Sequence, residues 1–226
     1  MCGRFTVTKL PQAWLDALGL GSVPNHKPRY NVAPSQNVLA AAHDIEEDRN
    51  LLRYFEWGLL PAWSKDPKVM NRPINARSET AAEKPSFRSA MRYRRCVLPS
   101  DGFFEWTGKG TSRRPNYFQH ADSTLFSFAG LWEEWESDHG ECIHSCTILT
   151  TQANALVAKV HNRMPVILDP DQAVAWLDPN QQNASAVQHY LTPYPAERMT
   201  VVPVSQHVNS PRNDDALCIA VEPELF

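Results

Sequence analysis

The chain has 226 residues, of which 42% are hydrophobic and 21% are charged, and its net charge is −3. This length can bury a core without disulfides, and its apolar runs are too short to span a membrane. The five cysteines are an odd number without a framework spacing, which excludes a disulfide scaffold and indicates reduced thiols. The chain start lacks the charged-then-apolar pattern of a signal peptide, so we expect a cytoplasmic protein.

The first third of the chain predicts one short helix, a loop and two strands. A helix is expected within residues 8–21 (TKLPQAWLDALGLG), where Leu10, Trp14 and Leu18 recur at four-residue spacing. Pro11 suits its first turn, and Gly19 or Gly21 can end it. Residues 24–37 (PNHKPRYNVAPSQN) predict a polar loop, and 37–42 (NVLAAA) and 50–59 (NLLRYFEWGL) predict strands.

The rest of the chain predicts a β-rich core with short helices. Residues 61–80 contain too many turn residues for regular structure, and so long a loop is usually functional. A meander of strands is expected at 96–106, 116–120, 124–135 and 142–151, with a later strand at 199–205. Short helices are expected at 154–160, 170–177 (capped by Asp169) and 184–190. We therefore predict one α+β domain over 1–226, with a barrel-like, mostly antiparallel core and short peripheral helices.

Four stretches place one reactive side chain between residues that favour burial: MCGRF, INAR, DGFFEW and VHNRMP. If Met1 is removed, Cys2 carries a free α-amine beside its thiol. Glu105 and His161 are candidates for proton transfer, and Asn75 can hold an oxygen atom. Each of these could equally be structural: a turn cap, an outward strand residue or a satisfied core histidine.

Arginines accompany these stretches. Arg4, Arg77 and Arg163 lie one or two residues from the reactive groups, where a guanidinium can bind an anion bidentately. A basic run, FRSAMRYRRC, contains Arg88 and three further arginines. It can hold phosphates despite the negative net charge, although such a run is usually a solvated face.

The stretch HGECIHSC invites a metal-site interpretation. On a strand, however, Cys142, His144 and Cys146 would follow one another along one face rather than surround an ion. We therefore expect no metal.

Ordered motifs give the chain a resemblance to a known family. MCGRF, RYNVAPSQ, WGLLPAW, INARSET, DGFFEW, ILTTQAN, HNRMPVIL and PVSQHVNSP extend over residues 2–209. Together they resemble the SOS-response-associated peptidase (SRAP) family of abasic-site processing proteins. The resemblance implies a DNA-damage protein that binds single-stranded DNA and cross-links to an abasic site. Members are also credited with removing their own initiator methionine, from which the word peptidase comes.

The resemblance also implies a role for each site residue. After loss of Met1, Cys2 would close a thiazolidine ring on the opened sugar, while Glu105 moves protons. His161 would protonate the sugar ring oxygen, and Asn75 would orient the opened sugar. The DNA contacts implied or expected beside them are Arg4, Arg77, Arg163, Trp63 as the stacking residue, and Arg88. No cofactor and no metal is implied, and we expect a monomer.

Two departures from the family pattern concern DNA contacts rather than aldehyde chemistry. The stretch SKDPKVMNRP after Trp63 is longer than usual, which affects the stacking assignment. Asn162 and Met164 stand where an acidic residue and a second arginine are common, so we expect weaker phosphate contacts.

Two other functions stay open at this level. N-terminal-nucleophile glutaminases also begin Met-Cys-Gly and use the exposed cysteine to attack an amide. A non-covalent single-strand DNA-binding module, with a structural Cys2, is the other alternative.

Overall fold

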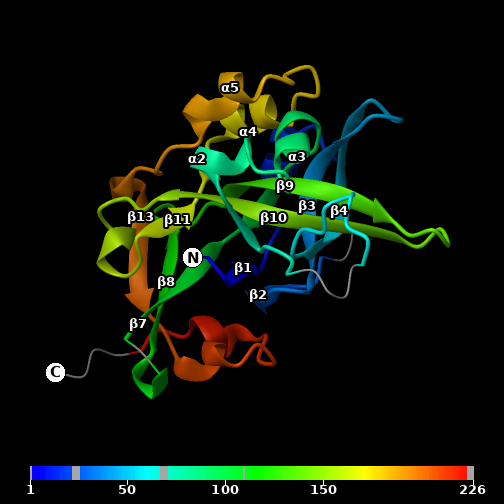
Figure 1. Ribbon diagram of the computed structural model, residues 1–226. Coiled ribbons are helices and arrows are strands. Elements are labelled where there is room, and N and C mark those ends of the chain that lie inside the picture. Colours follow the sequence, from blue (N-terminus) through cyan, green and yellow to red (C-terminus); the bar gives the residue numbers. More distant parts are fainter. Residues whose placement is uncertain (1, 22–25, 67–70, 109, 223–226) are drawn as a thin grey trace.

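The centre of the protein is a closed barrel of five strands (Figure 1). The computed structural model describes residues 2–21, 26–66, 71–108 and 110–222, so parts of the predicted loops, at 24–25 and 67–70, lie outside it. The barrel strands are β3 (Asn37–Asp44), β4 (Arg49–Trp57), β6 (Arg95–Ser100), β9 (Phe126–Glu136) and β10 (Cys142–Gln152). The ring closes because β10 pairs with β9 on one side and with β4 on the other. All its pairings are antiparallel except β10–β4, which confirms the predicted α+β fold with a barrel-like core.

A second sheet brings the start of the chain beside the DGFFEW stretch. Its order is β13 (Met199–Pro203), β8 (Arg114–His120), β7 (Gly102–Thr107), β1 (Phe5–Val7) and β2 (Arg29–Val32). Phe5 is paired with Phe103 on β7 and with Val32 on β2. The prediction of a loop over 24–37 is therefore wrong for residues 29–32, because β1 offers that segment a hydrogen-bonding edge. The predicted strand at 96–106 is in fact two strands, which part at Asp101 and belong to different sheets.

Short strands place two further motifs against β10. β5 (Asn75–Arg77) runs parallel to it and β11 (Arg163–Pro165) runs antiparallel, while β12 (Ile167–Leu168) pairs with β9. Thr150 of β10 faces both Arg77 and Pro165. The INAR and HNRMP stretches, which are far apart in sequence, are therefore neighbours in the sheet.

The helices are short, as the proline content predicts. They are α1 (Gln12–Ala17), α2 (Ser78–Ala81), α3 (Arg88–Tyr93), α4 (Pro170–Leu177) and α5 (Ala184–Val187). The short 3-10 helices span Gly110–Ser112, Val157–Lys159, Gln188–Tyr190, Ala196–Arg198, Gln206–Asn209 and Ala216–Ile219. Helices α2 to α5 gather along one side of the barrel, at the top of Figure 1. Within the described residues, no helix combines the length and the apolar character needed to cross a membrane.

The predicted helix ends are partly confirmed. Helix α1 ends where Gly19 adopts a φ of 66° and its N–H donates to the carbonyl of Asp16, but Pro11 is its N-cap and not part of its first turn. Asp169 caps α4, and its N–H donates to the side chain of Gln172. The helix predicted at 154–160 is only a 3-10 turn over Val157–Lys159, although the Asn154 side chain accepts the N–H groups of Leu156 and Val157 at its start.

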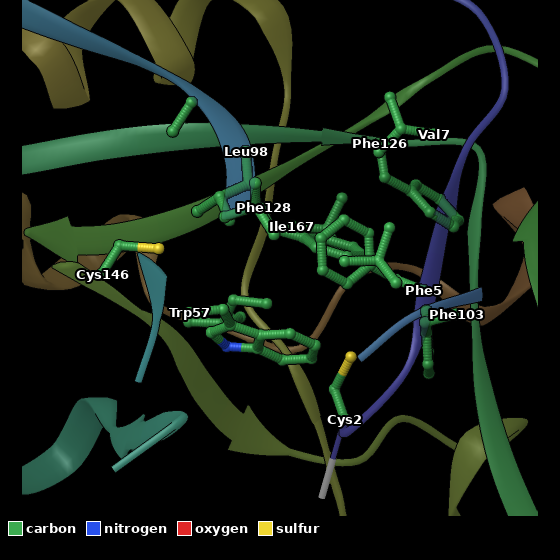
Figure 2. Packing of buried hydrophobic residues seen from close by; sticks show 14 of the residues in the cluster. Cys2, Phe5, Val7, Trp57, Leu98, Phe103, Phe126, Phe128, Cys146 and Ile167 are labelled. Carbon is green, nitrogen blue, oxygen red and sulfur yellow. The ribbon is translucent and has the colours of Figure 1, made fainter. Parts of the chain in front are cut away.

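Aromatic side chains bury the start of the chain in the barrel core. Cys2 and Phe5 are fully buried. The ring of Phe5 meets Trp57 at 5.1 Å and Phe128 at 6.0 Å, both edge to face, a geometry that adds about 0.5–1.5 kcal/mol per pair. Figure 2 shows the sulfur of Cys2 directed toward this same apolar cluster. The chain start is therefore a packed part of the fold.

Candidate functional site

The thiol of Cys2 is held in its neutral form. The side chain is fully buried, and its Sγ donates to the carbonyl of Arg4 at 3.9 Å. Burial raises the pKa of Cys2 well above its usual range, and the carboxylate of Glu105 raises it further. A thiolate at this position therefore needs a neighbouring group that accepts the proton.

Asn75 connects the INAR stretch to Cys2. Its Nδ2 donates to the carbonyl oxygen of Cys2 at 2.8 Å. Its Oδ1 is buried and accepts no hydrogen bond from the described part of the chain. Because an unpaired buried acceptor costs roughly 1–3 kcal/mol, this oxygen is suited to a donor from a bound molecule.

A polar cavity of about 600 Å³ opens beside Cys2. It contains three predicted site residues, Arg4, Glu105 and His161. Its lining is Gly3, Arg4, Glu105, Trp106, Gly108, Gly110, Arg113, His161 and Asn209. A more apolar cavity of about 510 Å³ lies beside α1 and α4 and contains none of the predicted site residues. Because the two cavities are similar in volume, the candidate site is identified by its reactive residues and not by its size.

The two candidate proton-transfer groups enter this cavity from different elements. Glu105 lies on β7, opposite Asn116, and is only 4% exposed. His161 precedes β11 and is half-buried. Its Nδ1 lies 3.0 Å from the backbone N of Arg163 and 3.2 Å from the carbonyl oxygen of the same residue, which holds the ring against the start of β11.

Arg4 is fixed at the cavity wall by the C-terminal part of the chain. Its Nη1 donates to Asn31 Oδ1 at 2.8 Å and to the carbonyl of Val208 at 2.9 Å. Burial and then the charge of Arg113 lower its pKa, but a guanidinium remains charged at neutral pH. The cavity therefore presents a fixed positive charge.

Sequence reasoning missed three residues of this cavity: Trp106, Arg113 and Asn209. The guanidinium groups of Arg113 and Arg4 lie 5.0 and 5.9 Å from the Trp106 ring, and Trp106 Nε1 donates to Asn209 Oδ1 at 2.7 Å. Trp106 and Asn209 fall inside the motifs DGFFEW and PVSQHVNSP, and this membership could have marked them as candidate site residues. Nothing in the sequence singles out Arg113.

The other two arginines beside the motifs differ in their surroundings. Arg163 donates both terminal nitrogens to Glu79, at 2.6 and 2.8 Å, and one also donates to the carbonyl of Thr150. Arg77 is exposed on β5. Met164, at the position where a second arginine is common, is fully buried and faces the core. Arg163 is therefore already paired with the carboxylate of Glu79, a partner that the sequence does not reveal.

The more distant predicted contacts lie outside the cavity. Trp63 is 60% exposed, and its Nε1 lies 3.5 Å from the carbonyl of Pro85. Arg88 is exposed at the start of α3. The predicted basic stripe does not extend along the whole run, because Arg94 pairs with Glu133 and Arg95 is buried.

Comparisons with known proteins agree with the motifs. The family model described as SOS response associated peptidase (SRAP) matches residues 1–211. The abasic site processing protein YoaM of Bacillus subtilis (strain 168) is 40% identical, over 98% of this chain and 99% of that protein. The abasic site processing protein HMCES of Xenopus tropicalis is 30% identical, over 97% of this chain and 78% of that protein. A crystal structure of a protein from Bacteroides thetaiotaomicron has a TM-score of 0.86 and 26% identity, covering 98% of this chain and all of that one. Because the family match spans most of the sequence, this chain belongs to the SOS response associated peptidase (SRAP) family.

Proposed function

We propose that this protein processes abasic sites in DNA by capturing the ring-opened sugar on Cys2 as a thiazolidine. The observation that carries the proposal is the position of Cys2, with Asn75 on its carbonyl and the charge of Glu105 acting on its thiol, beside the cavity that contains His161. The names of the relatives, abasic site processing proteins, support the same substrate.

The reaction begins with hydrolysis of the peptide bond between Met1 and Cys2. This step consumes one water, releases methionine and frees the α-amine of Cys2. The amine then condenses with the sugar aldehyde to an imine and releases one water. The thiol adds across the C=N bond, so that a carbon–sulfur bond forms and the nitrogen gains a proton. The second attack is intramolecular, which is worth roughly 7–11 kcal/mol in well-aligned systems.

Each catalytic residue has a role that suits its surroundings. Glu105 accepts the proton of the Cys2 thiol, which burial keeps neutral. His161 donates a proton to the sugar ring oxygen and favours the open aldehyde. The unpaired Oδ1 of Asn75 accepts a hydroxyl of the opened sugar, while its Nδ2 holds the Cys2 carbonyl.

The DNA strand is held by charge around this cavity. Arg4 and Arg113 supply positive charge at its wall for the phosphates that flank the lesion, and Arg77 extends the contact. Arg163 reaches a phosphate only by exchanging its bond to Glu79. We propose single-stranded DNA as the substrate, because a sugar with no complementary strand opposite it is free to enter the cavity beside Cys2. Exposed Trp63 is available to stack on a neighbouring base.

Intact-mass spectrometry tests the proposal directly. The purified protein is incubated with a single-stranded oligonucleotide that contains one abasic site. The expected product has the mass of the protein without Met1 plus the oligonucleotide minus one water. Cys2→Ala should give no such heat-stable product, whereas Cys142→Ala, at an exposed cysteine, should give it normally.

Other outcomes favour the alternatives. The same adduct at the same rate from Cys2→Ala, or an adduct that retains Met1, would overturn the mechanism. Ammonia release from glutamine would favour a glutaminase, and binding without any covalent product would favour a plain DNA-binding module.

A further inference from the structure

Three potential metal ligands converge on the β9–β10 hairpin, outside the cavity beside Cys2. His144 lies directly opposite Glu134 in the antiparallel pair, and Cys142 lies two residues away on the same face. His144 Nε2 is 2.6 Å from Glu134 Oε2 and 3.9 Å from Cys142 Sγ. The three ligand atoms all lie within 4.8 Å of one another.

We propose that Glu134, Cys142 and His144 bind a borderline divalent transition-metal ion of the Zn²⁺ class, with the fourth position taken by water. One carboxylate oxygen, one imidazole nitrogen and one thiolate are the donor types that Zn²⁺ accepts in proteins. Metal–ligand bonds of about 2.0–2.3 Å at tetrahedral angles place neighbouring ligand atoms about 3.3–3.6 Å apart. The His144–Glu134 and His144–Cys142 separations lie on either side of this range, so small shifts of the exposed Glu134 and Cys142 side chains complete the site.

The proposed site differs from the expectation drawn from HGECIHSC, which was that no metal binds there. Cys142 and His144 do follow one another along a strand, and Cys146 is fully buried and takes no part. The third ligand comes instead from the neighbouring strand, where Glu134 stands off the line of the other two. Only the register between β9 and β10, which the sequence does not show, brings it there.

The imidazole is held in place before any ion binds. Its ring packs edge to face against Phe55, at 6.3 Å, and Trp132, at 6.2 Å. Glu134 and Glu136 bring two carboxylates to this hairpin, and Glu136 lies directly opposite Cys142. The same carboxylates create a negative field that attracts a cation, and binding exchanges the thiol proton for the ion.

The location separates this site from the proposed DNA chemistry. In Figure 1 the β9–β10 hairpin projects beyond the body of the protein, away from the chain start. None of the three ligands lines the cavity that contains Glu105 and His161. The other described cysteines, Cys2, Cys96, Cys146 and Cys218, are buried. A thiolate–metal signal therefore reports Cys142.

The test is a Co²⁺ titration of the chelator-treated full-length protein, followed by the thiolate-to-cobalt charge-transfer absorption, with Zn²⁺ as competitor. We expect saturation at one ion per chain and displacement of Co²⁺ by Zn²⁺. Cys142→Ser should remove the charge-transfer band, and His144→Ala and Glu134→Gln should each weaken Co²⁺ binding by at least about tenfold. His139→Ala, which changes an exposed histidine of the same hairpin, should bind as the wild type does.

Two results would overturn the site. One is the absence of a saturable band with stoichiometric Co²⁺. The other is unchanged affinity in both His144→Ala and Glu134→Gln, which would show binding by a lone thiol. Adduct formation with abasic DNA should be equal in all these variants, so the two proposals fail independently.

Discussion

Glu105→Gln separates two effects that the Glu105 carboxylate has on the Cys2 thiol. The substitution keeps the shape of a side chain that is only 4% exposed and removes its charge. Loss of the charge lowers the pKa of the thiol, which alone would supply more thiolate and speed ring closure. Loss of the proton acceptor slows ring closure, because a positioned general base contributes roughly 10²–10⁴-fold.

The structure indicates which effect is larger. Burial is the main cause of the raised pKa of Cys2, and the Glu105 charge is the smaller one. The thiol therefore stays neutral near pH 7 even without Glu105, and the gain in thiolate is small. We expect Glu105→Gln to form the adduct about 100-fold more slowly or worse at pH 7. The deficit should shrink as the pH rises, because hydroxide then takes over removal of the thiol proton.

The assay is a single-turnover measurement of adduct formation with protein in excess over an abasic oligonucleotide, from pH 6 to pH 10. Glu83→Gln, at an exposed carboxylate, is the matched control, and circular dichroism checks that both variants are folded. Adduct formation by Glu105→Gln at the wild-type rate or faster at pH 7 would show that Glu105 acts on the thiol through its field alone. The assigned proton transfer would then be wrong.

Three further predictions test the DNA contacts and the buried thiols. Arg77→Ala should weaken single-strand binding and reduce the salt dependence of affinity by up to about one counterion, measured by fluorescence anisotropy; an unchanged slope removes Arg77 from the interface. Glu79→Gln should tighten binding several-fold in the same assay if Arg163 reaches a phosphate, since Glu79 now occupies that guanidinium; equal or weaker binding would make Arg163 purely structural. Above about pH 8.5 the free energy of unfolding should fall by about 1.4 kcal/mol per pH unit for each buried thiol, because the unfolded thiol ionises while burial keeps the folded pKa raised. Cys146→Ser should make this decline shallower in denaturant titrations. An identical slope would show that the buried Cys146 thiol does not contribute to the pH dependence of the free energy of unfolding.

The local patterns predicted the fold class and many of its elements, and the motifs pointed to residues that the fold brings close together. Cys2, Glu105 and His161 stand out because a reactive group interrupts residues that favour burial, and the fold brings Glu105 and His161 to one cavity beside the chain start. The strands β9 and β10 were also visible, because both are rich in aromatic or β-branched residues. Their burial is nearly continuous, and only the last part of β9 alternates between core and solvent. The β10–β4 pairing that closes the predicted barrel-like core could not be assigned, because the two segments share no local signal.

Partners contributed by distant segments account for most of the misses. Arg95 belongs to a basic run, yet it is buried and donates to the carbonyls of Trp176 and Asp178. The position of Arg113 over Trp106 depends on how the β7–β8 connection folds back. Gly108 permits that turn with a φ of 77°, where an added Cβ would meet the carbonyl oxygen of Ser112 at 2.5 Å. Such contacts follow from the assembled fold and leave no mark on the neighbouring sequence.

In the proposed mechanism, burial of the Cys2 thiol accounts for selectivity as well as for stability. A neutral thiol with a raised pKa reacts poorly with soluble electrophiles and oxidants, since the thiolate is the reactive form. In the proposed mechanism, an aldehyde that enters the cavity meets the α-amine first, and imine formation then holds the carbon beside the sulfur and Glu105. The thiol then reacts only after its electrophile is attached to the α-amine of the same residue. A cysteine elsewhere in the core, such as Cys146, is equally buried but has no α-amine to begin the sequence. In this mechanism, selective reaction of Cys2 therefore requires both its position at the chain start and its packing against Phe5 and Trp57.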